Sequence, residues 1–431
     1  MHTGETVKAK TRKWLVHVEI FGLYLLVFAL PTLESVKWAG LGLYLIGTLG
    51  RRWLGGQIFW RRPQPFEWML LIMIGSALIS MLVNWPLPNG TSGTEKVLTY
   101  CLLGWLIYTG DYSQKEILGL LVIMTAGVLV GLVWSAHDFF GRQNPFLEFR
   151  SIPNLNRSAI YQLIALFMML GMVLDVNFRS LRSRLFFGCS FFVSSVALLV
   201  MGSRAALLGF MTGSFVLGLC LIRKKITWLW LFLGLVLVFT TMASVTVLSN
   251  NPILKEKMHK FTHYYYDLRS GGGLEATITE SERVRWSYAK LAWAQITQGG
   301  HFLFGTGPGT YKYIDVDKLD FKKPLYIFKK KSWTGPSHPH DEFLWRWVEV
   351  GLVGLAVHLV FLGFLAVTLY RCRPNHRKIT WNWVCCVGFL ATALICGLFN
   401  TVLTNEMGWL AMIGVGSFMS ACREKDGNLL S

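Results

Sequence analysis

The sequence has 431 residues, of which 53% are hydrophobic and only 15% are charged, and its mean hydropathy is +0.44. Soluble domains typically contain about 25% charged residues, so this composition excludes a water-soluble globular protein and indicates that most of the chain lies in lipid. The net charge of +18 does not indicate nucleic-acid binding, because many basic residues fall in short connections between apolar runs, where they orient a membrane protein and contact anionic headgroups.

Long apolar runs recur along the whole chain. Because about 20 apolar residues are needed to cross a hydrocarbon core of roughly 30 Å, we predict an all-α polytopic membrane protein with about twelve transmembrane helices. The second is short, and the tenth is long enough to tilt or to project beyond the bilayer. The predicted spans are 14–33, 36–50, 67–86, 95–110, 117–136, 158–176, 185–202, 205–222, 227–248, 342–370, 380–400 and 406–422.

Lysine and arginine residues predict the orientation of these spans. With an even number of spans, the basic connections all fall on one side, which the positive-inside rule identifies as the cytoplasm. Both termini are then cytoplasmic. The predicted organisation is transmembrane helices 1–9 over residues 1–248, a periplasmic loop domain over 249–341, and transmembrane helices 10–12 over 342–431.

The long outer segment is expected to have its own structure, since structureless loops of that length are uncommon in compact proteins. Within it, residues 282–298 place apolar side chains at helical spacing, which predicts a helix. The sequence Gly305-Thr306-Gly307-Pro308-Gly309 then predicts a turn. It lacks the Lys-Ser/Thr pair of a phosphate-binding P-loop, so a structural turn is the favoured interpretation.

Three arginines are candidates for binding an anionic substrate. Arg204 lies in a tight turn between two apolar runs, where it either snorkels to the headgroups or binds an anion. Arg283 and Arg285 lie on the predicted loop helix, and a guanidinium fork matches phosphate oxygens better than a lysine does. Because the two are separated by about 200° around a helix, they cannot both face one phosphate.

His338 and His340 form a second group, at an expected solvent-facing end of the loop where the tenth span begins. A zinc site needs a further clear ligand, so we favour a neutral imidazole that positions or deprotonates a hydroxyl group. Pro339 restricts His338 to an extended backbone and favours that residue as the one that contacts substrate. Asp315-Val316-Asp317 resembles a metal-binding DXD triplet, but two solvated carboxylates are the favoured interpretation.

Short motifs in this region resemble those of the O-antigen ligases and their relatives, the O-antigen polymerases and protein O-oligosaccharyltransferases. The first is Ser203-Arg204-Ala205-Ala206, a turn between two spans. The second is the loop-helix Arg283 followed by Gly305–Gly309, and the third runs from His340 through Leu344 to Gly351. The chain has Asp341 where the family commonly has Asn. Family spacing favours His340 over His338, and Arg283 over Arg285.

The resemblance implies an all-helical glycosyltransferase of the C superfamily. Such an enzyme would transfer O-antigen from undecaprenyl pyrophosphate to lipid A–core at the periplasmic face, with inversion and without metal, nucleotide or other cofactor. Arg204, Arg283 and Arg285 would bind the substrate pyrophosphate, while His338 or His340 would act on the acceptor hydroxyl. The partners implied are these two lipid-linked substrates and membrane lipids.

Three other functions remain open from the sequence. An O-antigen polymerase or a protein O-oligosaccharyltransferase shares the donor and the motifs, and acceptor choice is not encoded in them. A twelve-span transporter is less favoured, because transporters carry charged residues within their spans. Here we expect almost no buried charge in the spans and see no similarity between the two halves.

Overall fold

The computed structural model describes residues 2–55, 63–88, 90–141, 147–152, 154–178, 180–221, 280–321, 338–374 and 379–429. Within these ranges the chain is helical and contains no strand. The α-helices are α1 (His2–Ala29), α2 (Glu34–Leu54), α3 (Pro65–Val83), α4 (Ser92–Thr109), α5 (Gln114–Gly141), α6 (Leu155–Leu174), α7 (Leu181–Met201), α8 (Arg204–Leu221), α12 (Glu280–Gln298), α13 (Glu342–Arg371), α14 (Trp381–Gly397) and α15 (Asn405–Leu429), with 3-10 turns at Tyr311–Tyr313 and Val316–Lys318.

These helices coincide with the apolar runs of the sequence. Each predicted span overlaps one helix except 227–248, which lies outside the described residues. Within the described ranges, five helices are long and apolar enough to cross a membrane, namely α3, α5, α6, α7 and α13, and α8 and α14 contain shorter apolar helices. The all-helical, multi-pass character is therefore confirmed, while the count of twelve spans stays a prediction.

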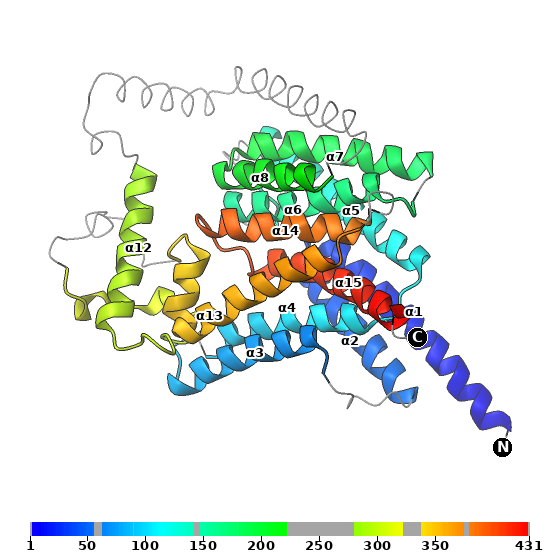
Figure 1. Ribbon diagram of the computed structural model, residues 1–431, viewed down its shortest axis with the longest axis horizontal. Helices are drawn as coiled ribbons and strands as arrows, with labels where there is room; N and C mark the ends of the chain where they lie inside the picture. Colours follow the sequence, from blue (N-terminus) through cyan, green and yellow to red (C-terminus); the bar gives the residue numbers. More distant parts are fainter. Residues whose placement is uncertain are drawn as a thin grey trace.

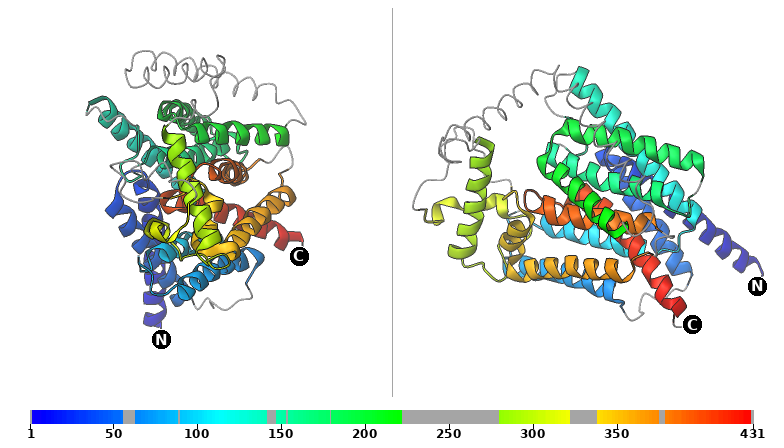
Figure 2. Two further views of the ribbon diagram at one scale, coloured as in Figure 1. Left: turned by 90° about the vertical axis from the view of Figure 1, so that its left-hand side faces the viewer. Right: turned by 45° about the horizontal axis from the view of Figure 1, so that its top comes forward.

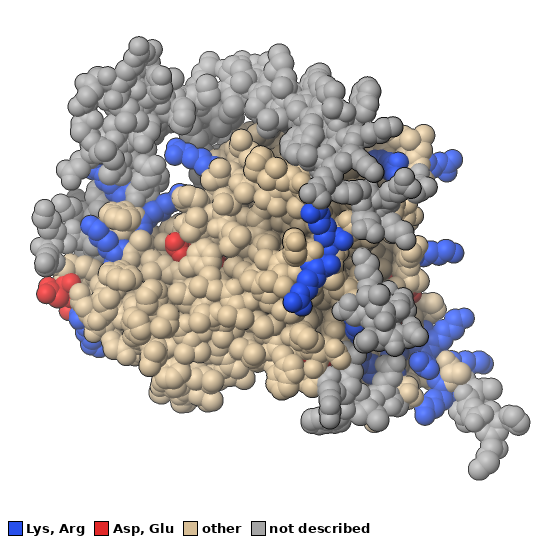
Figure 3. Space-filling view, viewed as in Figure 1, with Lys and Arg blue, Asp and Glu red and all other residues tan. Residues whose placement is uncertain are grey.

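The bundle has two distinct ends. Both termini lie at one end, and α12 lies beyond the other end of the long helices (Figures 1 and 2). A broad surface without Lys or Arg separates the ends (Figure 3). Exposed side chains on the outer helices are apolar, as expected for contact with lipid, and include Leu71, Ile72, Phe192, Met211, Phe215 and Val360.

Helix α6 forms the centre of the bundle. Its residues are buried from Ser158 to Met172, and it packs against α5, α7, α8, α14 and α15. A helix that is apolar on every side is stable only when it is surrounded in this way. The beginning of α6 is therefore held in a fixed position relative to the helices around it.

Buried charges are more numerous in the helices than the sequence led us to expect. Glu19, Lys37, Arg346 and Glu349 are buried. They are stabilised by partners on other turns or other helices; Arg51 Nε, for example, donates a 2.7 Å hydrogen bond to Glu19 across the α1–α2 pair. The expectation of almost no buried charge was wrong, because pairing between helices is not visible in a linear sequence. The paucity of charge therefore no longer argues against a transporter.

Candidate active site

The two histidines directly precede α13, whose first turn is fixed by hydrogen bonds. Asp341 is the N-cap, and its side chain accepts a 2.8 Å hydrogen bond from the Leu344 N–H. The buried Glu342 carboxylate accepts from Arg346 Nε and from the Val402 N–H, both at 2.8 Å. Asp and Asn are equally good N-caps, so the departure from the family's Asn preserves the helix start.

His338 and His340 lie against each other at this helix start. Their ring centroids are 4.1 Å apart, and the His340 ring lies 5.9 Å from that of Tyr288 on α12. His338 is only 7% exposed, in contrast to the solvent-facing position expected from the sequence. His340 has φ +57°, a left-handed conformation that non-glycine residues rarely adopt, and its Nδ1 is buried without a hydrogen-bond partner.

Burial keeps both imidazoles neutral. Together with the positive charge of Arg157, burial lowers the pKa of His338 to about 4, while a hydrogen bond with the Asn400 side chain acts in the opposite direction. Burial and the neighbouring His338 lower the pKa of His340 to about 3, and the charges of Arg285 and Arg157 add to the effect. At neutral pH each imidazole is therefore uncharged, but it is a weaker base than a free histidine. The two nearby cations favour an anion beside the imidazoles, and such an anion would offset part of the lowering of the pKa.

Arg157 was not among the candidates identified from the sequence. It lies in the first turn of α6, where the Asn154 side chain accepts hydrogen bonds from the backbone N–H groups of Asn156 and Arg157. The Arg157 Nε is buried without a hydrogen-bond partner. The sequence feature that could have identified Arg157 is the one that identified Arg204: each is an arginine directly before an apolar run.

The three predicted arginines occupy different positions. Arg285 is half-buried and is close enough to the histidines for its charge to lower the pKa of both, whereas Arg283 is exposed. This agrees with the prediction that the two cannot face one phosphate. Arg204 is exposed at the first turn of α8, and its neighbour Ser203 donates a 3.1 Å hydrogen bond to Asn156 Oδ1, beside Arg157.

The loop Gly305–Gly309 is a structural turn wrapped around α13, as predicted. The Glu349 carboxylate accepts hydrogen bonds from the N–H groups of Gly309 at 2.7 Å and Tyr311 at 3.2 Å. The Glu349 carbonyl accepts from the Gly307 N–H at 2.9 Å. These N–H groups, which would face the phosphate in a P-loop, are thus directed to α13.

Helix α13 is interrupted at Gly351, which has φ +79° and ψ −177°. The hydrogen bonds lost by the helix are replaced by the loop: the Leu352 N–H donates to the Phe302 carbonyl at 3.0 Å, and the Val353 N–H to the Leu303 carbonyl at 3.2 Å. A Cβ atom at Gly351 would collide with the Leu303 carbonyl. Glycine is therefore required here both by conformation and by space.

The Asp315-Val316-Asp317 triplet lies on the surface. The Asp315 side chain accepts a hydrogen bond from the Asp317 N–H and forms a 3.0 Å ion pair with Lys318, and both partners of that pair are exposed. In the part of the chain that the structure describes, no group of three or more His, Cys, Asp or Glu residues is arranged to hold a metal ion.

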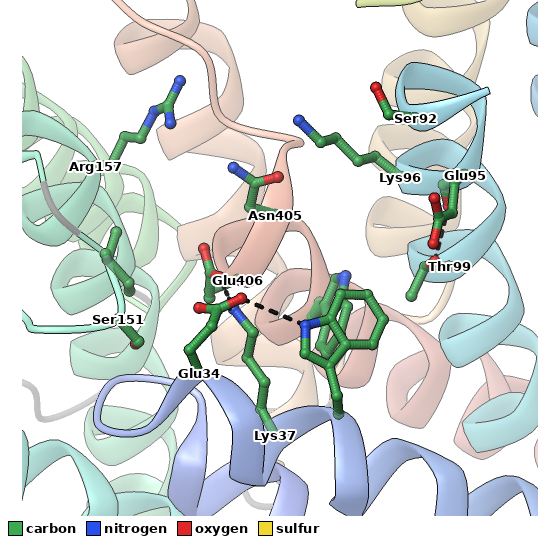
Figure 4. Close-up of a pocket in the computed structure, with 13 residues that line it drawn as sticks. Glu34, Lys37, Ser92, Glu95, Lys96, Thr99, Ser151, Arg157, Asn405 and Glu406 are labelled. Atoms are coloured by element: carbon green, nitrogen blue, oxygen red, sulfur yellow. Dashed lines mark hydrogen bonds and ion pairs between the residues drawn. The ribbon is translucent and has the colours of Figure 1, made fainter. Parts of the chain in front are cut away.

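A cavity of about 370 Å³ is lined in part by Arg157 (Figure 4). Residues of α2, α4, α6 and α15 line it, together with Ser151 and Ile152 from the segment before α6. Arg157 and Lys96 approach the same space from opposite walls (Figure 4). Arg157 thus lines the cavity, and its charge also acts on both imidazoles, which connects the cavity with the pair of histidines.

Comparison with known protein families matches the part of the chain that contains the two histidines. Residues 189–359 match the family model described as O-antigen ligase. The matched segment extends from α7 into α13 and includes Arg204, Arg283, Arg285 and both histidines. No curated protein sequence matches the chain. The resemblance suggested by the short motifs is confirmed: residues 189–359 of this multi-pass membrane protein match the O-antigen ligase family model.

Proposed function

We propose that the protein is an O-antigen ligase, a glycosyltransferase that moves O-antigen polysaccharide from undecaprenyl pyrophosphate to lipid A–core. The transfer takes place at the periplasmic face of the inner membrane, at the end of the bundle where α12 lies. The observation that carries the proposal is the pair of neutral histidines flanked by Arg157 and Arg285, beside a cavity and within a matched O-antigen ligase domain.

In the proposed reaction, side chains of this protein carry out every proton transfer and charge stabilisation. The acceptor oxygen forms a bond with the anomeric carbon of the donor, while the bond from that carbon to the pyrophosphate oxygen breaks. The hydroxyl proton passes to an imidazole, for which we favour His340 because its Nδ1 has no partner. Arg157 and Arg285 stabilise the negative charge that develops on the pyrophosphate. Attack opposite the leaving group inverts the anomeric configuration.

Two further arginines complete the proposed substrate site. Arg204 and Arg283 are exposed near the ends of their helices, so we assign them to the rim of the site, where they attract the anionic donor. Their contribution to the transition state is smaller than that of the two arginines beside the histidines, because charges exposed to water are screened. His338, which is more buried than His340, orients its neighbour.

The proposed topology places both termini in the cytoplasm and residues 249–341 in the periplasm. Its support is the location of the two termini at one end of the bundle and of α12 at the other (Figure 1). Fusions after Lys225 and after Gly271, which lie outside the described residues, test it. A periplasm-dependent reporter should be active only after Gly271; activity of both fusions on one side would refute the twelve-span arrangement.

The function is tested by reconstituting the purified protein in liposomes with lipid-linked O-antigen and lipid A–core. We expect lipopolysaccharide to form without nucleotide and in the presence of EDTA. Loss of product on chelation, restored by zinc or magnesium, would overturn the metal-independent mechanism. Formation of longer donor chains without lipid A–core would instead identify a polymerase, and glycosylated protein acceptors would identify an O-oligosaccharyltransferase. A transporter would yield none of these products.

A further inference from the structure

The cavity beside Arg157 has the size and composition of a ligand site. Its volume of about 370 Å³ is within the range of roughly 300–1,000 Å³ that is typical of small-molecule pockets. In the proposed mechanism the donor pyrophosphate lies at Arg157 and Arg285, so carbohydrate must extend away from that point. The cavity is lined by Arg157 and does not include the histidines among its lining residues, so it offers such a space.

One wall of the cavity holds a carboxylate in a fixed position. The buried Lys37 Nζ donates to Glu34 Oε2 at 2.6 Å and also to Glu406 Oε1. The Trp38 indole N–H donates to the other Glu34 oxygen at 3.3 Å. The Glu34 side chain nevertheless remains 60% exposed, so it can accept further hydrogen bonds from a ligand. Lys37, whose charge is shared between two carboxylates, provides no net positive charge for an anion.

An indole ring lies next to this carboxylate. Trp38 is 45% exposed, and its ring is held edge-to-face against Trp409 with centroids 5.0 Å apart. An exposed but fixed indole provides a flat apolar surface at little entropic cost. A pyranose ring matches this combination, because it presents C–H bonds on its faces and hydroxyl groups around its edge. The apolar face can pack on Trp38 while a hydroxyl donates to Glu34.

The opposite wall, on α4, is also suited to hydroxyl groups. Ser92, Glu95 and Thr99 line it, and Glu95 is exposed. The cavity as a whole has carboxylates to balance its cations, with Glu34, Glu95 and Glu406 against Lys37, Lys96 and Arg157. An electrically balanced, polar lining with a cation at one edge fits a neutral sugar that is joined to an anionic group.

We propose that this cavity binds a pyranose ring close to the glycosidic bond that is broken or formed in the transfer. Trp38 packs on the face of the ring, and Glu34 accepts hydrogen bonds from its hydroxyl groups. The inference rests on the proposed function and adds residues that recognise carbohydrate. The sugar comes either from the lipid-linked donor or from the lipid A–core acceptor. Both sources have the same chemistry, and kinetics distinguish them.

The first experiment measures transfer while one substrate is varied and the other is saturating. Trp38→Ala should raise the KM of one substrate by about tenfold, the size expected for loss of an aromatic contact, with little change in kcat. Glu34→Gln, which keeps the shape of the side chain, should raise the same KM by a smaller factor. Trp53→Ala is the matched control, since Trp53 lies on the same helix, is 83% exposed and does not line the cavity.

The KM values distinguish the two possible sources of the sugar ring, the donor and the acceptor. A higher KM for the donor assigns the ring to the O-antigen, and a higher KM for the acceptor assigns it to the core oligosaccharide. Unchanged KM values for both substrates, or an equal loss in Trp53→Ala, would overturn the inference. If wild-type protein transfers normally in that case, the proposed function stands without this carbohydrate site.

A second measurement does not depend on transfer. Lipid-free core oligosaccharide and a lipid-free O-antigen repeat unit are titrated calorimetrically into the detergent-solubilised protein. Binding of one of them, weakened in Trp38→Ala but not in Trp53→Ala, supports the site even if the reaction proves to be a different one. Binding of glycerophosphoethanolamine with no binding of either oligosaccharide would show that the cavity holds a lipid headgroup and would overturn the inference.

Discussion

The turn around α13 and the cluster formed by His338, His340, Arg157 and Arg285 differ in how their buried polar groups are hydrogen-bonded. At the turn, the Glu349 carboxylate and the N–H groups of Gly309 and Tyr311 satisfy one another. In the cluster, His340 Nδ1 and Arg157 Nε are buried without hydrogen-bond partners. A buried polar group without a partner destabilises a fold. Such groups also occur elsewhere in the bundle, for example His358 on α13, but in the cluster they lie beside positive charges and near a cavity, where a ligand can supply the partner. The comparison separates the scaffold from the site.

The largest effect on the transfer rate is expected at the histidines of the cluster. His340→Ala should lower the transfer rate about 100- to 10,000-fold, the usual contribution of a positioned acid–base group. His338→Ala should lower it less if His338 orients its neighbour. His137→Ala, an exposed histidine at the end of α5, is the control. Rates are measured in liposomes with saturating donor. A wild-type rate for correctly folded His340→Ala would assign the role to another group.

The arginines give the next largest effect. Arg157→Ala and Arg285→Ala should each cost roughly 2–4 kcal/mol in the transition state, or about 30- to 1000-fold in rate. Replacement by Lys should restore little, because the guanidinium fork is lost. Arg283→Ala should have a smaller effect, since Arg283 is exposed. Equal losses at Arg283 and Arg285 would mean that burial beside the histidines does not identify the donor site.

The scaffold should respond in stability rather than in chemistry. Gly351→Ala forces a side chain into a left-handed conformation and against the Leu303 carbonyl, which should cost about 1–3 kcal/mol or more and lower the Tm in detergent. Gly363→Ala is the matched control on the same helix, because a Cβ atom there meets nothing within 4 Å. If both variants melt alike, the interruption of α13 is not the conformation that stabilises the protein.

The pH dependence sharpens the comparison without mutation. Because the pKa values of His338 and His340 are lowered to about 4 and about 3, kcat/KM should show no acid limb near the usual histidine pKa of about 6.5. A bound pyrophosphate offsets the charges of Arg157 and Arg285 and raises the pKa of the imidazoles, so the limb in kcat should lie at higher pH. A limb near 6.5 in kcat/KM would contradict burial of both rings.

The same shifts predict how stability depends on pH. The unfolded chain binds protons at its histidines below about pH 6.5, whereas the folded chain does so only near pH 4 and below. Stability should therefore fall as the pH decreases from about 6.5 towards 4. A thermal unfolding series over this range provides the control for the rate profile.

The smallest effect is expected at the N-cap of α13. Asp341→Asn should leave stability and rate nearly unchanged, because the amide oxygen can accept the hydrogen bond from the Leu344 N–H. Asp341→Ala should cost about 1 kcal/mol of stability. A large loss of transfer in Asp341→Asn, with an unchanged Tm, would show that the carboxylate has a chemical role beyond capping.

Local features of the molecule could be predicted from the sequence. Apolar runs determined the helices, residues 282–298 fall within α12, and the glycine-rich turn lies where it was expected. Contacts between distant segments could not. The charge of Arg157, at the start of α6, acts on both histidines, and Lys37 pairs with Glu406 across the bundle. The choice between Arg283 and Arg285 depends on the rotation of α12 about its axis, which family spacing does not specify.

The interruption at Gly351 also determines how deep α13 sits in the membrane. As one straight helix, Glu342–Arg371 would measure about 45 Å, well beyond the roughly 30 Å hydrocarbon thickness. The part that follows the break, from Leu352 to Arg371, measures about 30 Å and matches that thickness without tilt. Under the proposed topology the break thus lies at the outer boundary of the bilayer. The same glycine that shapes the turn then holds His338 and His340 above the lipid surface, at the level where two lipid-anchored substrates present their headgroups.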